Sequence, residues 1–202
     1  MKKNLLLVAF IGLFCWSCVT PGGVISTVGS APSGSAPAQQ SAAPESKAFK
    51  TPMTFKNLAR NFQYTIPAGW YKVDGEPDSE SVSFMKEGGT LGFIIHITQM
   101  VPSFPRKDAV KAGLKQDTER MSINQVLEAR RRDDGDAKKK CGVIGWEQVE
   151  APQKNSFQRI IWQCYDGENY YMNFMAHSTN EDFAAAKPTL RQIMDSIKFC
   201  VN

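Results

Sequence analysis

The stretch that decides the fold is residues 157–177, which read FQRIIWQCYDGENYYMNFMAH. Two runs rich in aromatic and β-branched side chains, residues 157–165 and 170–177, stand on either side of Asp166 and Gly167. Runs of this composition favour strands, and an Asp-Gly step favours a tight turn between antiparallel strands. These residues therefore predict a β-hairpin.

Outward from this hairpin, the chain alternates between strand-like and helix-like segments. Further strands are predicted at residues 62–66, 82–85, 91–100, 125–132 and 138–149, the last two joined by a turn at residues 133–136. Val110, Leu114 and Met121 recur at helical spacing and predict a helix over residues 107–121. Thr179 is expected to cap a second helix, which Pro188 restarts at a first-turn position. This order predicts an α+β fold, a largely antiparallel β-sheet sandwiched by helices.

The first residues have the three parts of a bacterial export signal. Lys2 and Lys3 are followed by an apolar run at residues 5–14, which is too short to span a membrane, since spanning takes about 20 residues. Ser17 then supplies the small residue that a lipoprotein signal peptidase accepts before Cys18. We therefore expect lipid attachment at Cys18. Ordinary secretion is the alternative, but no Ala-x-Ala-like cleavage site follows the apolar run.

Composition divides the rest of the chain. Residues 1–17 are expected to be the lipoprotein signal peptide, and residues 18–50, rich in Gly, Ser, Ala, Pro and Gln, the lipidated N-terminus and a disordered linker. Residues 51–202 are long enough for one domain. The formal net charge of the whole chain is only +4, which does not favour nucleic acid as a partner.

Three segments of the predicted domain resemble the PsbP-like family. They are residues 62–70, FQYTIPAGW, residues 170–176, YYMNFMA, and residues 193–199, IMDSIKF. The resemblance covers most of the chain from Phe62 to Phe199, in motifs that mark a fold and not a site. It implies an α/β/α sandwich of a group that generally acts by binding and includes extrinsic photosystem II proteins and relatives that bind Ran. Because one fold serves many functions, it implies no particular partner for this chain.

The search for catalytic chemistry gives no candidate. The sequence contains no G-x-S-x-G, H-E-x-x-H, G-x-G-x-x-G or P-loop pattern. Its two histidines, His96 and His177, have no second histidine or paired carboxylate at ligand spacing. The acidic turn at residues 133–136 is too short for a calcium loop. We therefore expect no catalytic residue, no metal site and no cofactor.

Two basic runs flank the acidic turn and form the candidate anion- or partner-binding site. If the predicted hairpin forms, its two strands bring the six cations together near the tip. Such a cluster could bind an anionic lipid, a glycan or an acidic envelope protein, or it could simply keep the hairpin solvated. The six residues are Arg130, Arg131, Arg132, Lys138, Lys139 and Lys140.

The cysteines of the domain suggest a disulfide, because exported proteins meet an oxidising compartment. Cys141 and Cys164 lie on neighbouring predicted strands and would stand opposite each other if the turn falls at residues 151–154. The alternative is that both are buried free thiols. Cys200 would then be free, or available for an intermolecular bond.

Two functional hypotheses remain open at this stage. The first is a membrane-tethered binding or assembly module that engages another cell-envelope component on the extracytoplasmic side of the membrane. The second is an envelope enzyme whose site carries no recognisable motif. A concave site with convergent polar groups and a strongly shifted pKa would favour the enzyme.

Overall fold

The computed structural model describes residues 47–136, 138–154 and 156–201. Cys18, the expected signal peptide and most of the expected linker lie outside these residues, so the lipid-attachment site stays a prediction. The described residues form ten strands and two helices. The expected α+β class is confirmed. Neither helix has the length and apolar composition needed to span a membrane.

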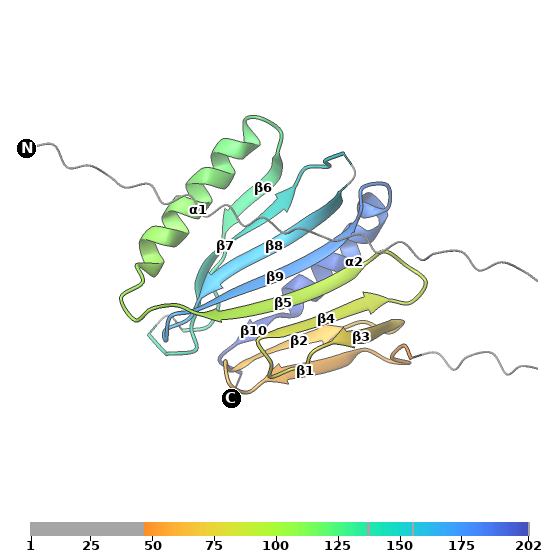
Figure 1. The fold of residues 1–202 in the computed structure, drawn as a ribbon, viewed down its shortest axis with the longest axis horizontal. Helices are drawn as coiled ribbons and strands as arrows, with labels where there is room; N and C mark the ends of the chain where they lie inside the picture. Colours follow the sequence, from red (N-terminus) through yellow and green to blue (C-terminus); the bar gives the residue numbers. More distant parts are fainter. Residues whose placement is uncertain (1–46, 137, 155, 202) are drawn as a thin grey trace, which may run out of the picture. The chain divides into compact units, whose positions relative to one another are not determined.

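The strands form two antiparallel sheets (Figure 1). The larger sheet holds, in spatial order, β3 (Trp70–Asp74), β4 (Ser81–Lys86), β5 (Gly92–Gln99), β9 (Tyr170–Thr179), β8 (Phe157–Tyr165), β7 (Ile144–Glu150) and β6 (Val126–Arg131). The smaller sheet holds β1 (Met53–Asn57), β2 (Phe62–Ile66) and β10 (Lys198–Phe199). The hairpin predicted from residues 157–177 is β8 and β9 at the centre of the larger sheet.

The main core lies between the larger sheet, the smaller sheet and helix α2 (Phe183–Ser196). Alternation along β8 directs Ile160, Trp162 and Cys164 into this core, where all three are fully buried. The ring of Trp162 stacks on Phe174 of β9 at a centroid distance of 5.3 Å. Phe49 also packs against this core, so the packed domain begins two residues before the expected boundary at Thr51.

Helix α1 (Arg106–Met121) covers the opposite face of the sheet at the β6–β7 edge (Figure 1). Gly113 lets the helix approach closely, because a Cβ there would lie 2.4 Å from the ring of Trp146 on β7. The Trp146 indole N–H donates to Asp117, which is buried at the inward position between Leu114 and Met121. Helices on the two faces of an antiparallel sheet give the layered arrangement that the sequence predicts.

Helix α2 differs from its prediction at Pro188. The helix begins at Phe183 and continues through Pro188, whereas a restart at this residue was expected. Proline lacks an amide hydrogen, so at the sixth position of the helix it removes only one backbone hydrogen bond. Leu190, Ile193 and Met194 beyond it are buried against the core and hold the helix together.

The connection between β6 and β7 is longer than predicted. Arg131 pairs with Trp146, and an isolated bridge joins Asp134 to Val143, so residues 135–142 form the connection. The expected tip at residues 133–136 and the expected strand start at residue 138 are therefore wrong. All three acidic side chains of the expected tip accept backbone hydrogen bonds, because Gly145 N–H donates to Asp133, Phe199 N–H donates to Asp134 and Lys138 N–H donates to Asp136.

The expected Cys141–Cys164 disulfide is also wrong. Cys164 lies opposite Gly145 of β7, four residues along the strand from Cys141, and its thiol is free and buried. A shift of four residues keeps every side chain on its own face, so the apolar pattern alone could not distinguish the two registers. Cys141 lies in the connection before β7, where it forms a disulfide with Cys200 with a Cα–Cα distance of 5.3 Å.

Candidate functional site

The arginine run of the candidate site is divided between the two faces of the sheet. Arg130 and Arg132 contact Glu147 on the α2 side of the sheet, whereas Arg131 contacts Asp133 and also lines a groove beside α1. Arg130 lies directly opposite Glu147 of β7. The six predicted cations therefore do not form one cluster, and each group has its own surroundings.

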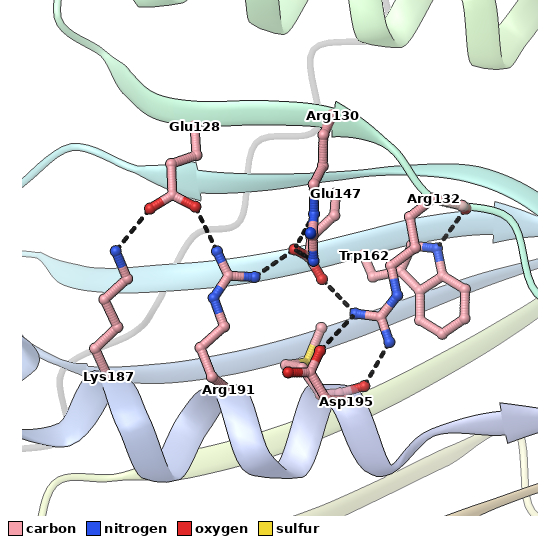
Figure 2. Close-up of polar contacts among 9 residues, drawn as sticks. Glu128, Arg130, Arg132, Glu147, Trp162, Lys187, Arg191 and Asp195 are labelled. Carbon is pink, nitrogen blue, oxygen red and sulfur yellow. Dashed lines mark hydrogen bonds and ion pairs between the residues drawn. The ribbon is translucent and has the colours of Figure 1, made fainter.

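Glu147 is the centre of an ionic network between the sheet and α2 (Figure 2). Its carboxylate is 1% exposed and contacts the guanidinium groups of Arg130, Arg132 and Arg191. Burial disfavours the charged form, but Arg132 and Arg191 outweigh it and hold the pKa of Glu147 below its ordinary value. The carboxylate is therefore ionised and its charge is neutralised locally.

The same network of ion pairs holds α2 against the edge of the sheet. Lys187 and Arg191, one helical turn apart, contact Glu128 of β6 at 2.7 and 2.6 Å. The guanidinium of Arg132 lies 3.9 Å from the ring centroid of Trp162 and donates to the main-chain oxygen of Met194 at 2.6 Å. Arg130 and Arg132 are thus committed to contacts within the domain, which gives them a structural role.

Lys138, Lys139 and Lys140 instead line a pocket of about 510 Å³, which we call the lysine pocket. Three connections meet there: the β1–β2 turn, the β6–β7 connection and the β8–β9 turn. The structure thus separates the lysines from the arginines with which they were predicted to cluster. The lining residues are Ala59, Arg60, Asn61, Lys138, Lys139, Lys140, Cys141, Asp166 and Glu168.

Covalent and backbone contacts hold the lysine-bearing connection in place. The Cys141–Cys200 disulfide ties it to the C-terminal residues, and Cys200 N–H donates to the carbonyl oxygen of Asn61 at 2.9 Å. Gly167 N–H donates to the carbonyl oxygen of Lys140 at 2.7 Å. A Cβ at position 167 would lie 2.7 Å from the Cα of Lys140, so this close approach requires glycine. The pocket wall is therefore preorganised.

The acidic side chains of the pocket are already engaged. Glu168 contacts Lys140 at 3.0 Å and Arg60 at 3.2 Å, and the hydrogen bond from Lys140 is the main cause of its lowered pKa. Asp166 accepts hydrogen bonds from the amides of Glu168 and Tyr170, and burial raises its pKa. Asp166 therefore stabilises the β8–β9 turn and, through Arg60, the pocket wall.

Two cations of the pocket are left without an acidic partner. The ammonium groups of Lys138 and Lys139 form no ion pair with any described residue, and both side chains are exposed. Arg60 is fixed beside them by Tyr170, whose ring centroid lies 3.6 Å from the guanidinium carbon. The pocket can therefore bind an anionic group through two exposed lysines next to an arginine that Tyr170 and Asp166 hold in place.

Neither histidine belongs to this pocket. His96 is exposed on β5, and His177 is half-buried on β9, where burial and then Arg159 lower its pKa. Among residues 47–136, 138–154 and 156–201, no group of three or more His, Cys, Asp or Glu side chains is arranged to hold a metal ion. The absence of a cofactor stays an expectation from the sequence.

Sequence reasoning missed three charged residues of the pocket, Arg60, Asp166 and Glu168. Each is a single charged residue in a turn, and only the fold brings them beside the lysines. The disulfide that anchors the pocket was missed for the same reason, since Cys141 and Cys200 are 59 residues apart.

Comparisons with known proteins show a similarity of fold alone. No protein-family model and no curated protein matches the chain. The chain is similar to the solution structure of cyanobacterial PsbP (CyanoP) from Synechocystis sp. PCC 6803, with 13% identity and a TM-score of 0.48. The match covers 75% of this chain and 94% of that chain. At this level of similarity no function passes from one chain to the other.

Proposed function

We propose that this chain is an exported lipoprotein whose domain binds an acidic partner protein of the cell envelope in the lysine pocket. The export signal and Ser17-Cys18 support a lipid anchor on the extracytoplasmic side of a membrane. Three acyl-type chains on one cysteine would make that anchor effectively permanent. The domain would then meet its partner near the membrane surface.

The proposal rests mainly on two lysines that have no acidic partner in the described part of the chain and lie on a connection held by a disulfide. Lys138 and Lys139 are exposed and have no acidic partner among the described residues, while the disulfide at Cys141 limits the motion of the connection that bears them. An anionic group bound there gains charge-assisted hydrogen bonds, and little of that gain is lost to ordering the backbone.

The mixed charge of the lining favours a protein over a simple anion. Four cations surround two carboxylates, Asp166 and Glu168. A bare phosphate or a dense polyanion would meet repulsion from Glu168, which is partly exposed. A protein surface can instead present carboxylates to Lys138 and Lys139 and leave neutral or basic groups beside Glu168.

The test is affinity capture with the full-length protein as bait in envelope extracts. Replacing both Lys138 and Lys139 by Gln removes two exposed ion pairs of up to about 1 kcal/mol each, so capture should weaken by at most roughly 30-fold. The matched control, Lys86→Gln with Lys154→Gln, makes the same charge change at the other end of the sheet and should leave capture unchanged. Equal loss in both double variants would contradict the proposal.

A further inference from the structure

A second basic site lies between α1 and the β6–β7 edge of the larger sheet. It is a groove of about 610 Å³, which we call the α1 groove. It shares no lining residue with the lysine pocket. The lining residues are Lys107, Lys111, Leu114, Lys115, Thr118, Glu119, Arg131 and Ile144.

The cations of the groove are three lysines of α1 and one arginine of β6. Lys107, Lys111 and Lys115 are spaced four residues apart, so they lie along one side of α1. Arg131 comes from β6, which packs beside the helix. The one acidic lining residue, Glu119, lies 3.7 Å from Lys115. Lys107 and Lys111 form no ion pair with any described residue, so the groove carries a clear excess of positive charge.

The wall beneath these cations is apolar. Leu114 and Ile144 are half-buried within the groove and leave part of their side chains open to a ligand. The inward side of α1 is already filled by Val110, Gly113 and Asp117, which pack on β7. Leu114 therefore lies on the flank of the helix, and the long methylene stems of the lysines extend this apolar wall.

Exposed apolar side chains also flank the helix in the sequence. Val101, five residues before α1, is 62% exposed, and Ile123, two residues after it, is 61% exposed. Cations above an apolar wall match the layered chemistry of an anionic membrane surface, in which phosphates lie above acyl chains.

We propose that the α1 groove docks an anionic phospholipid of a membrane surface. The headgroup phosphate lies between Lys107 and Lys111, beside Arg131, whose guanidinium also contacts Asp133 at 2.7 Å. The first part of an acyl chain lies against Leu114 and Ile144. Charge complementarity and the apolar wall select this occupant over an acidic protein, because an acyl chain can lie against Leu114 and Ile144 while the phosphate meets the cations. The site is independent of the lysine pocket.

The experiment uses the full-length protein and phosphatidylcholine vesicles that contain increasing fractions of a photoreactive phosphatidylglycerol. After irradiation, the adducts are mapped by peptide. We expect adducts on peptides that contain residues 107–119 or Ile144. Lys107→Gln and Lys111→Gln should each weaken the apparent affinity about five-fold. Lys115→Gln should weaken it less, because Glu119 already pairs with Lys115, and the triple variant should weaken it at least about 25-fold. Photoreactive phosphatidylcholine should label these peptides far less.

Two control variants separate this proposal from others. Lys56→Gln, Lys86→Gln and Lys154→Gln together make the same charge change away from the groove and should leave the groove adducts unchanged. Lys138→Gln with Lys139→Gln should leave them unchanged as well, although it weakens partner capture. Melting curves check that every variant is folded.

Three results would overturn the lipid site. They are adducts that map outside the groove, equal labelling by the zwitterionic probe, and unchanged labelling of the folded triple variant. If only the Lys138 and Lys139 variant loses the lipid adducts, the lipid binds at the lysine pocket and the α1 groove is not its site.

Discussion

At the scale of single residues, Glu147 is a buried charge at the centre of an ionic network. Its carboxylate is 1% exposed and contacts three arginines, two of which are less than a quarter exposed. Removing one partner of a buried ionic group leaves the others desolvated and unpaired, and this costs more than the pair itself contributes. The network therefore makes the domain sensitive to this one carboxylate.

We expect Glu147→Gln to lower the free energy of unfolding by about 3 kcal/mol at neutral pH, because Arg132 and Arg191 lose their counter-charge. The control is Glu128→Gln, which removes a carboxylate from the same network that is 45% exposed. It should cost less than about 1 kcal/mol. Denaturant unfolding measures both, and a cost for Glu147→Gln no greater than the control would contradict this account.

The pH dependence of stability should carry the signature of Glu147. Its pKa in the folded domain lies below the ordinary value of 4.5, so the folded state favours the ionised form. This contribution is fully present above pH 4.5 and is lost as the pH falls through the folded pKa. The stability difference between wild type and Glu147→Gln should therefore shrink on acidification below pH 4.5. A constant difference down to low pH would be inconsistent with a lowered pKa.

At the scale of elements, the close packing of α1 against the sheet depends on Gly113. Replacing an exposed helical glycine by alanine normally stabilises a helix by up to about 1 kcal/mol. Here a Cβ would lie 2.4 Å from the rigid ring of Trp146, and overpacking of this kind costs about 1 to 3 kcal/mol. The steric cost of a Cβ at position 113 is therefore larger than the gain in helix propensity from glycine to alanine.

We therefore expect Gly113→Ala to destabilise the domain by about 1 kcal/mol. In a Trp146→Leu background the same change should be neutral or stabilising, because the ring is gone. Thermal unfolding of the four proteins in this cycle measures the coupling. If Gly113→Ala stabilises the domain in the background that keeps Trp146, then α1 does not pack closely against the Trp146 ring.

The disulfide joins two elements that are distant in sequence. Because Cys141 and Cys200 enclose a loop of nearly 60 residues, the chain-entropy model gives a stabilisation of about 4 kcal/mol. Cys200→Ser should lose about this amount, and a reductant should destabilise wild type but not the variant. Free alkylation of Cys141 in the denatured, unreduced wild-type protein would show that the bond is absent.

The spacing of apolar residues predicts which strands and helices form, whereas contacts between residues distant in sequence determine how the strands pair. The strands at residues 157–165 and 170–177 and the helix at residues 107–121 follow from local patterns, and the structure has them at nearly these bounds. The register of β7 against β8 does not follow, because shifts of an even number of residues preserve the face of each side chain. This ambiguity led to the wrong cysteine pair.

The candidate site was predictable only in part for a related reason. The sequence shows that Lys138, Lys139 and Lys140 are exposed cations, and the structure places them in a pocket. Whether a cation is free depends on partners from other elements, such as Glu147 for Arg130 and Arg132. No spacing rule connects Glu147 to Arg191, which lies 44 residues away.

At the scale of the whole molecule, action at a membrane surface requires the lipid anchor at Cys18. The motivation is the short apolar run that ends at Ser17-Cys18. When cells are grown with a fatty-acid analogue, the wild-type protein should become labelled. The Cys18→Ser variant should remain unlabelled and keep its signal peptide. Cys15→Ser is the control and should be labelled normally. Full labelling of the Cys18 variant would exclude this residue as the attachment site.

The measurement that most directly tests the central claim is photo-crosslinking in intact cells from inside the lysine pocket. A photoreactive amino acid at position 59 replaces an exposed alanine of the pocket wall, and the control position is Lys154, at the other end of the sheet. We predict one discrete protein adduct from position 59, absent from position 154 and lost when Lys138 and Lys139 are changed to Gln. The same adducts from both positions, or an adduct that persists without the two lysines, would contradict the account.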